Sequence, residues 1–546
     1  MADPRAERLD AARAAHEEED VLTDVSPRSP RMHALSQVTH RADDPPTSPE
    51  PGRGGEPLEL VSRLCEALDQ EHVRYCHFKS NEALWRSAAG LNDLDLLVDP
   101  ADARAFEAVL QRLGFRGARL ARWKELPGVW HSYGLDRSSG RLVHVHAHYQ
   151  LLVGDDMTKN YRLPIEGPYI GSSVRAAPFM IPAPEYEFAL FLVRMVIKHC
   201  PWDSIASLQG SLTASEEREL AHLLERVDPD EVWPIMEPHL DRISPALWRR
   251  LLRAVQPGAS TRFRVQTARR LQGALAPYGR RRTALDTWLK VWRRGRTFAR
   301  RRVLRRPAAR KRLGGGGRLI AIVGGDGAGK STAVQDLTSW LGGDFQTHSV
   351  HLGKPPRSLA SAVMKGAMTM AASVKRSPVP SGTELRAVVT STEGGSMTPR
   401  TSARMVWELL TARDRYRAYR RARREASRGA LVVCDRFPLR EIKLMDGPLS
   451  ARMTDPQRWG RLVRTIAARE RRFYERIGSP DVLIVMRVHP DIAVSRRSDE
   501  REAFLRPRSE EVWRTDWSRT PAVVIDAGRP KAEMLTDVRA AVWSRL

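Results

Sequence analysis

The segment Gly324-Gly-Asp-Gly-Ala-Gly-Lys-Ser-Thr332 combines a run of glycines with a lysine and two hydroxyl side chains. Glycines let backbone N–H groups converge on phosphate oxygens, and a following helix adds its positive N-terminus. Lys330 can reach the β- and γ-phosphates of a nucleoside triphosphate, and the Ser331 hydroxyl can ligate Mg²⁺. The pattern G-x-x-x-x-G-K-[ST] therefore predicts that ATP is held by nine residues: Gly324, Gly325, Asp326, Gly327, Ala328, Gly329, Lys330, Ser331 and Thr332.

A second group of residues suited to chemistry lies far upstream. Asp93 and Asp95 alternate with leucines, so both carboxylates project from one face of a predicted strand. Two carboxylates placed in this way can share a Mg²⁺ ion that binds nucleotide phosphates. In a later predicted strand, His144, His146 and His148 also alternate and present three imidazoles on one face. The alternative to metal binding is that the two aspartates are an acidic pair at a turn and that the three histidines are solvated surface residues.

The chain divides into four segments that position these residues. Residues 1–55 have few large apolar side chains and end in turn formers, which predicts a disordered tail. Residues 56–275 mix predicted strands and helices, and this pattern indicates an α+β domain. Residues 276–317 form a basic linker. Residues 318–546 open with a strand, the glycine-rich loop and a helix, which predicts an α/β P-loop NTPase domain with a parallel sheet flanked by helices. Within it, about 375–401 is rich in Ser, Thr, Pro and Gly and predicts a long mobile loop.

Composition narrows the setting of the protein. The hydrophobic fraction of 42% is ample for globular domains, and no apolar run approaches the length of a transmembrane helix. The N-terminus is polar and does not resemble a secretory signal. Four scattered cysteines cannot build a disulfide framework or a structural zinc site. We therefore expect a cytoplasmic protein, with the inner face of the membrane as a peripheral location. The sequence does not indicate an oligomeric state.

The basic linker carries much of the formal net charge of +25. Residues 280–312 contain fifteen Lys and Arg residues and one acidic residue, Asp286. In the first half of this stretch, Leu285, Trp288, Leu289 and Trp292 share one side of a predicted helix. This apolar stripe is expected to pack on a flanking domain; the alternative is a peripheral contact with an anionic membrane. No recognised nucleic-acid-binding motif is present, so specific nucleic-acid binding is not expected.

The glycine-rich loop and several later motifs resemble the thymidylate kinase family. The resemblance covers about 320–345 and 405–546, with the loop and the Asp-Arg pair as its most specific parts. The motifs are Gly-Asp-Gly-x-Gly-Lys-Ser at the loop, Leu409-Leu-Thr-Ala-Arg-Asp-Arg415, Leu431-Val-Val-Cys-Asp-Arg-Phe437, Val488-His-Pro-Asp491 followed by Arg496, and Val524-Ile-Asp-Ala527.

This resemblance implies roles for individual residues. Asp326 would lie near the acceptor nucleotide and the metal, and Arg415 would face the acceptor base. Asp435 would lie near the metal ion, and Arg436 would hold the acceptor phosphate. Arg496 would act from a mobile lid as a catalytic cation. These roles suit phosphoryl transfer, which depends on positioning and charge neutralisation.

Other features of the same domain leave the identity of the phosphoryl acceptor undetermined. The lid stretch also contains Arg497, Arg501, Arg506 and Arg508, but interleaved acids are equally typical of a solvated charged helix. The segment after Arg436 departs from the Ser-rich continuation of thymidylate kinases, and the insertion at about 355–400 is foreign to them. The alternative for Asp435 and Arg436 is a structural role, as an ordinary ion pair at the end of a strand.

The upstream motifs resemble those of nucleotidyltransferase-fold proteins. The residues that carry this resemblance are His77-Phe-Lys-Ser80 and Gly90-Leu-Asn-Asp-Leu-Asp-Leu-Leu-Val-Asp99. Where that family has a third carboxylate, this chain has the histidines of the strand at 142–152. Three interpretations stay open: an active nucleotidyltransferase with an altered metal site, a degenerate binding module, and a site for a softer metal such as zinc.

Two functional hypotheses follow. The first is an ATP- and Mg²⁺-dependent phosphotransferase that transfers the γ-phosphoryl group to a nucleotide or another phosphate- or sugar-bearing acceptor. The second is an ATP-binding sensor or scaffold with a degenerate nucleotidyltransferase module, acting at an anionic membrane or on envelope precursors. Phosphorylation of a defined acceptor distinguishes the two hypotheses.

Overall fold

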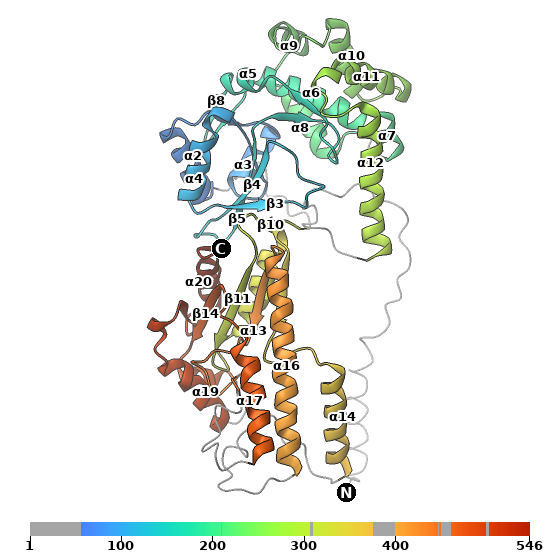
Figure 1. Cartoon of the computed structure of the whole chain (residues 1–546). Coiled ribbons are helices and arrows are strands. Elements are labelled where there is room, and N and C mark those ends of the chain that lie inside the picture. Colours follow the sequence, from blue (N-terminus) through green and yellow to red (C-terminus); the bar gives the residue numbers. More distant parts are fainter. Residues whose placement is uncertain are drawn as a thin grey trace, which may run out of the picture.

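The protein consists of two α/β bodies stacked end to end, each built around its own sheet (Figure 1). The computed structural model describes residues 56–208, 210–305, 310–374, 399–445, 447–448, 460–497 and 502–546. The predicted tail at 1–55 and most of the predicted mobile loop, 375–398, lie outside the described residues. Helix α14 (Leu359–Val374) lies within the insertion at 355–400, and α16 (Pro399–Ser427) begins at its end.

The N-terminal body contains a six-stranded mixed sheet. In spatial order its strands are β1 (Tyr75–His77), β2 (Leu94–Val98), β5 (Leu142–His148), β4 (Val129–Leu135), β3 (Arg116–Arg119) and β10 (Arg312–Leu313). The β2–β5 pair is parallel, and the other neighbouring pairs are antiparallel. The single strand expected at 142–152 is two strands, β5 and β6 (Leu151–Val153), interrupted at Tyr149, whose N–H bonds to the Gly128 carbonyl instead.

Alternation along the central strands separates an apolar face from a polar face. Leu94, Leu96 and Val98 of β2, with Val143 and Val145 of β5, pack against α2 (Glu59–Gln70) and α4 (Ala103–Arg112), forming a buried core. The intervening aspartates and histidines consequently project from the opposite face of the sheet. The two predicted carboxylates and three predicted imidazoles therefore share one surface.

Helices complete the N-terminal body. The longest, α6 (Pro184–His199), is buried along most of its length because its neighbours surround it. Those neighbours are α8 (Ala214–Leu224), α9 (Pro229–Met236), α10 (Pro245–Val255) and α11 (Thr261–Ala274). The remaining elements are α3 (Leu84–Ala88), β7 (Tyr161–Leu163), α5 (Glu166–Gly171), β8 (Val174–Ala176), β9 (Phe179–Ile181) and α7 (Trp202–Ala206).

The C-terminal body contains a five-stranded parallel sheet. In spatial order its strands are β12 (Thr347–His351), β13 (Leu431–Asp435), β11 (Arg318–Gly324), β14 (Val482–Arg487) and β15 (Ala522–Asp526). Helices α13 (Lys330–Asp344) and α20 (Lys531–Trp543) cover one face, and α16 and α19 (Glu502–Arg514) cover the other. The central strands are apolar runs because both of their faces are buried.

The first strand of this sheet, β11, lies at its centre. The chain then adds β12 and β13 on one side and β14 and β15 on the other. Ligands of open α/β sheets bind beyond the carboxyl ends of the strands at such a point of divergence. The glycine-rich loop follows β11 directly and therefore lies at this position.

Helix α12 (Thr283–Phe298) of the basic linker packs through its charged face, whereas the sequence predicted packing through its apolar stripe. Lys290 is buried, with its Nζ 3.2 Å from Asp286 and 3.3 Å from Asp203. Three residues of the predicted stripe face outward: Leu285, Trp288 and Trp292 are 49%, 59% and 44% exposed, whereas Leu289 is half-buried. The expectation that the stripe packs on a flanking domain was wrong, because ion pairs of the charged face hold the helix in place.

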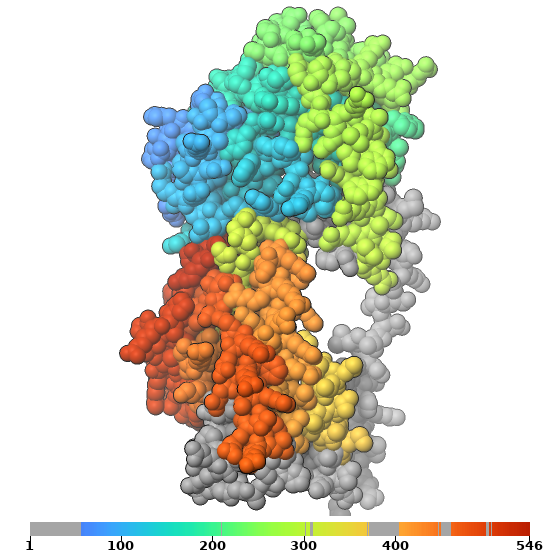
Figure 2. Space-filling view, viewed as in Figure 1, coloured from blue at the N-terminus to red at the C-terminus, as the bar shows by residue number. Residues whose placement is uncertain are grey.

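Short contacts join the two bodies where the linker ends (Figure 2). Strand β10 adds to the edge of the N-terminal sheet through β3. Tyr133 of β4 packs against Phe345, and its hydroxyl lies 3.3 Å from an Asp344 carboxylate oxygen. Trp543 of α20 donates a hydrogen bond to the Gly114 carbonyl. Lys311 of the linker forms a β-bridge with Phe345 of the C-terminal body. The linker therefore contributes structure to both bodies instead of only spanning them.

Candidate functional site

The glycines of the loop allow two helices to pack directly on it. Gly327 and Gly329 have φ angles of 82° and 78°, which side-chain-bearing residues rarely adopt. A Cβ atom at Gly327 would lie 2.6 Å from the carbonyl oxygen of Ala493 in α18 (Pro490–Ser495). A Cβ atom at Gly325 would lie 2.5 Å from Ser509 Oγ in α19. The glycines thus serve both the loop conformation and its close packing.

Lys330 begins α13 and folds back over the loop. Its side chain is buried, its Nζ donates to the Gly325 carbonyl at 2.7 Å, and it lies 3.7 Å from Asp326 Oδ1. Ser331 and Thr332 follow in the first helical turn, where Ser331 is exposed. The predicted order of strand, glycine-rich loop and helix is present, and the α13 N-terminus faces the carboxyl edge of the sheet.

Asp326 gathers cations from three parts of the chain. Arg436 Nη2 and Arg508 Nη1 each donate to this buried carboxylate at 2.9 Å, and Lys330 is the third cation. Burial would raise the pKa of Asp326, but Lys330, Arg436 and Arg508 outweigh it and lower that pKa. Three cations around one carboxylate leave a net positive charge, which suits phosphate groups. In the sequence, Arg508 is one of several arginines in the predicted lid stretch, and its spacing does not distinguish it from the others.

Asp435 and Arg436 end β13, the strand beside β11. Asp435 pairs in register with Ile322, and its Oδ1 is buried with no hydrogen-bond partner in the parts of the chain that the structure describes. A buried carboxylate oxygen without a partner, at the edge that carries the loop, suits a hard cation such as Mg²⁺. Arg436 has a φ of 54°, a strained conformation for a non-glycine residue that directs its guanidinium to Asp326.

The segment that follows Arg436 forms the wall of a small pocket next to the loop. The lining residues are Val323, Gly324, Lys330, Arg436, Phe437, Leu439, Ile442 and Met445. Glu511 of α19 holds this segment by accepting the backbone N–H groups of Lys443 at 2.6 Å and Leu444 at 2.8 Å. Helix α19 therefore connects the loop and the pocket wall, through Arg508, Ser509 and Glu511.

Other predicted site residues have different partners. Arg415 is buried, and its guanidinium donates to the Leu352 carbonyl at 2.7 Å and the Gly353 carbonyl at 3.2 Å, which supports the chain after β12. Arg496 donates to the Ala527 carbonyl at 2.8 Å and so links α18 to the loop after β15. The structure thus brings Lys330, Asp326 and Arg436 together, while Arg415 and Arg496 bind backbone carbonyls elsewhere.

The remaining arginines of the predicted lid stretch differ in their surroundings. Arg506 pairs on the surface with Asp491 at 2.7 Å and Glu502 at 2.8 Å, as a solvated charged helix would. Arg501 lies outside the described residues.

The polar face of the N-terminal sheet collects the upstream residues. Asp93 Oδ1 lies 2.7 Å from His144 Nδ1, while Asp95 Oδ1 lies 2.9 Å from His146 Nδ1 and 3.0 Å from Lys79 Nζ. Burial would raise the pKa of Asp95, but Lys79 and the imidazoles outweigh it and hold that pKa well below its usual range. The two carboxylates consequently have separate partners.

The parallel sheet, its central glycine-rich loop and the buried lysine define an α/β protein with a candidate phosphate-binding loop. No family model matches the chain. It is 31% identical over 233 residues to the uncharacterized ATP-binding protein YghR of Escherichia coli K12, which covers 41% of this chain and 86% of YghR. It is 26% identical over 234 residues to the uncharacterized ATP-binding protein YghS of the same strain, over 42% of this chain and 94% of YghS. The chain belongs to the YghR family.

Proposed function

We propose that the C-terminal body is an ATP-dependent phosphotransferase acting on a small phosphate- or sugar-bearing acceptor, such as a nucleotide. The observation that carries the proposal is the convergence of Lys330, Arg436 and Arg508 around Asp326 beside the glycine-rich loop. The relatives' names support ATP as the donor. The resemblance to thymidylate kinases supports a phosphorylated acceptor.

On the donor side, the loop amides and the α13 N-terminus would hold the phosphates, and Lys330 would neutralise the β- and γ-phosphates. Ser331 and Asp435 are the residues that would hold Mg²⁺. When bound, Mg²⁺ supplies further charge neutralisation at the phosphate oxygens. The acceptor oxygen would form a new bond to the γ-phosphorus as the bond to the β–γ bridging oxygen breaks and releases ADP.

On the acceptor side, Arg436 is the central residue. Its guanidinium is 31% exposed and borders the pocket, and Asp326 is the anion that holds it. An incoming phosphate would compete with Asp326 for Arg436 and Arg508, because phosphate and carboxylate oxygens accept the same charge-assisted hydrogen bonds. The apolar wall of Phe437, Leu439 and Ile442 would exclude water from the transferring group.

Acceptor-dependent turnover tests this function. Purified full-length protein with Mg-ATP should release ADP much faster when the correct acceptor is present, in a screen of nucleoside monophosphates and sugar phosphates. Transfer of labelled phosphate to one acceptor class would establish phosphotransfer. Slow ADP release that no acceptor accelerates would favour the sensor or scaffold hypothesis instead.

The exposed face of α12 favours a second component of function, attachment to an anionic membrane. Leu285, Trp288, Val291 and Trp292 lie on one exposed surface, and the indoles of Trp288 and Trp292 stack on each other. Exposed arginines of the same linker, such as Arg282, Arg296 and Arg302, would face lipid headgroups, where each cation contributes about 1 kcal/mol. An amphipathic helix of this kind would lie in the membrane interface. Among the helices that the structure describes, none is long and apolar enough to cross a bilayer.

Replacing Trp288 and Trp292 together by alanine should reduce co-sedimentation with anionic liposomes several-fold. Binding of the unaltered protein should require anionic lipid and weaken as salt rises. Trp130→Ala is the matched control, because Trp130 is 58% exposed but belongs to β4 and not to α12. Unaltered protein that stays in the supernatant with anionic liposomes at low salt would exclude the membrane contact.

A further inference from the structure

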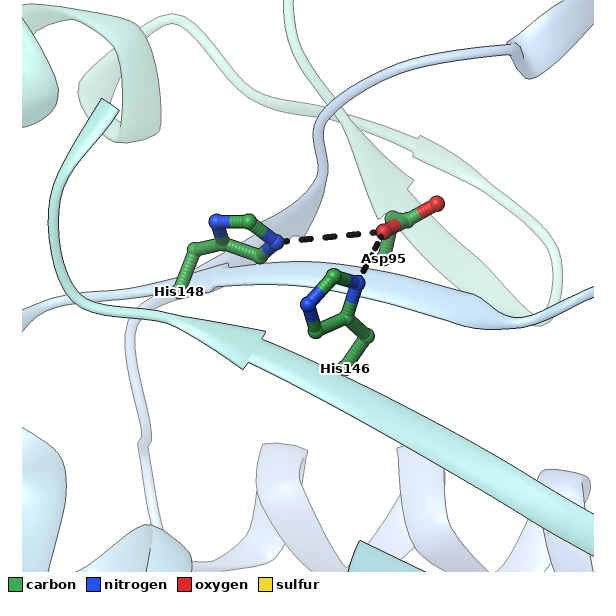
Figure 3. Close-up of side chains that lie close together, drawn as sticks. All are labelled: Asp95, His146 and His148. Atoms are coloured by element: carbon green, nitrogen blue, oxygen red, sulfur yellow. Dashed lines mark hydrogen bonds and ion pairs between the residues drawn. The ribbon is translucent and has the colours of Figure 1, made fainter. Parts of the chain in front are cut away.

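Three side chains on the polar face of the N-terminal sheet converge in a way that the proposed phosphotransfer does not use (Figure 3). Asp95, His146 and His148 each offer one ligand atom, and these atoms all lie within 4.8 Å of one another. We propose that these residues form a binding site for a divalent transition-metal ion of the zinc class. The site is independent of the glycine-rich loop and lies in the other body.

The sheet itself arranges these three ligands. Strands β2 and β5 are parallel neighbours, and their register places Asp95 directly beside His146. His148 follows two residues later on β5 and therefore projects from the same face. Ligands carried by hydrogen-bonded strands are held close to one geometry before an ion arrives, which lowers the cost of binding.

His148 provides an independent indication that a ligand is expected here. Its side chain is 9% exposed, and neither ring nitrogen has a hydrogen-bond partner in the described parts of the chain. Its ring packs against Phe78 at a centroid distance of 4.7 Å, so packing fixes the orientation of the imidazole. Figure 3 shows a His148 nitrogen directed toward Asp95. His148 Nε2 lies 3.9 Å from Asp95 Oδ1. Buried imidazoles normally have partners, and a metal ion in this position would supply the missing one.

The donor set selects the class of metal. Two imidazole nitrogens and one carboxylate oxygen suit Zn²⁺ and related transition metals, whereas Mg²⁺ prefers oxygen ligands. Three protein ligands leave a position for water or substrate, as in catalytic zinc sites. Asp93 is outside the cluster, because its carboxylate is engaged by His144. This proposal therefore replaces the expected Mg²⁺ shared by Asp93 and Asp95 with a softer ion held by Asp95, His146 and His148.

Lys79 determines how tightly an ion would bind. Its Nζ lies 3.0 Å from Asp95 Oδ1, the oxygen that also contacts His146. An ammonium group there competes with any cation for the same carboxylate. The Lys79 side chain is 26% exposed, so it has a path to solvent when an ion displaces it. Removal of this charge should strengthen metal binding, an outcome that a merely structural role of the three ligands does not predict.

Zinc titration of the full-length protein after chelator treatment tests the site. We expect one Zn²⁺ per chain, no measurable competition by equimolar Mg²⁺, and a visible absorption band when Co²⁺ is used as the probe. His148→Gln should weaken Zn²⁺ binding about 100-fold, since even supporting residues of metal sites are worth 10–100-fold. Lys79→Met should strengthen binding about tenfold, because it removes a competing unit charge.

His144→Gln is the matched control for His148→Gln. His144 lies on the same strand and face and is equally buried, but it is not one of the three ligands. Its replacement should change Zn²⁺ affinity less than about threefold. Absence of stoichiometric Zn²⁺ binding, equal losses in the His144 and His148 variants, or weaker binding by Lys79→Met would each overturn the proposal. Because Lys79→Met changes the affinity upward, a folding defect cannot imitate its expected result.

Discussion

Replacing Lys330 by alanine should reduce ATP turnover by about 10³-fold, the size of effect seen when one preorganised charge-stabilising group is removed. The Lys330 ammonium is buried against the loop, bonded to the Gly325 carbonyl at 2.7 Å, and is the cation that the loop itself contributes. Its loss would leave the γ-phosphate without that counter-charge while the loop backbone stays in place. Steady-state ADP release with Mg-ATP measures the effect.

Lys531→Ala is the matched control for this experiment. Lys531 is also the first residue of a helix, α20, but it is exposed. That variant should turn over ATP at the unaltered rate, and both variants should keep the thermal unfolding midpoint within a few degrees. Near-normal turnover by Lys330→Ala would refute the assignment of the glycine-rich loop as the donor site.

Replacing Arg436 by alanine should lower kcat/KM for the acceptor by about 10²-fold, while ATP affinity changes less than about threefold. The guanidinium lies at the border of the pocket, between Asp326 of the loop and the wall that starts at Phe437. Asp326 keeps Lys330 and Arg508 as partners in the variant, so the donor site should survive. Acceptor titrations at saturating ATP, together with equilibrium nucleotide binding, separate the two effects.

Arg440→Ala is the control for this second variant, because Arg440 is an exposed arginine four residues along the same segment. It should leave both constants unchanged. If Arg436→Ala weakens ATP binding as much as acceptor use, then Arg436 belongs to the donor site. If it unfolds the protein, Arg436→Lys tests the same role, since lysine keeps the charge and loses the bidentate geometry.

Features encoded locally were predictable from the sequence. The strand before Gly324, the glycine-rich loop and the helix beginning at Lys330 depend on residues adjacent in the chain, and all three are present. The alternation of Asp95 with leucines and of His146 with its neighbours placed both side chains on one polar face, because strand side chains alternate with a period of two. The strand ending at Asp435 was predictable from another local signal, because a short continuous apolar run is typical of a strand that is buried on both faces.

What the tertiary structure decided depends on contacts between distant segments. The sequence does not distinguish Arg508 from Arg506, yet only the packing of α19 on the loop brings Arg508 to Asp326 and leaves Arg506 on the surface. The apolar stripe of α12 shows the same limit. Its spacing predicted a face that packs inward, but the ion pairs of Lys290 with Asp203 and of Arg294 with Asp155 turned the charged face inward instead. Periodicity reports which side chains share a face, whereas the partner of that face is set by residues far away in the chain.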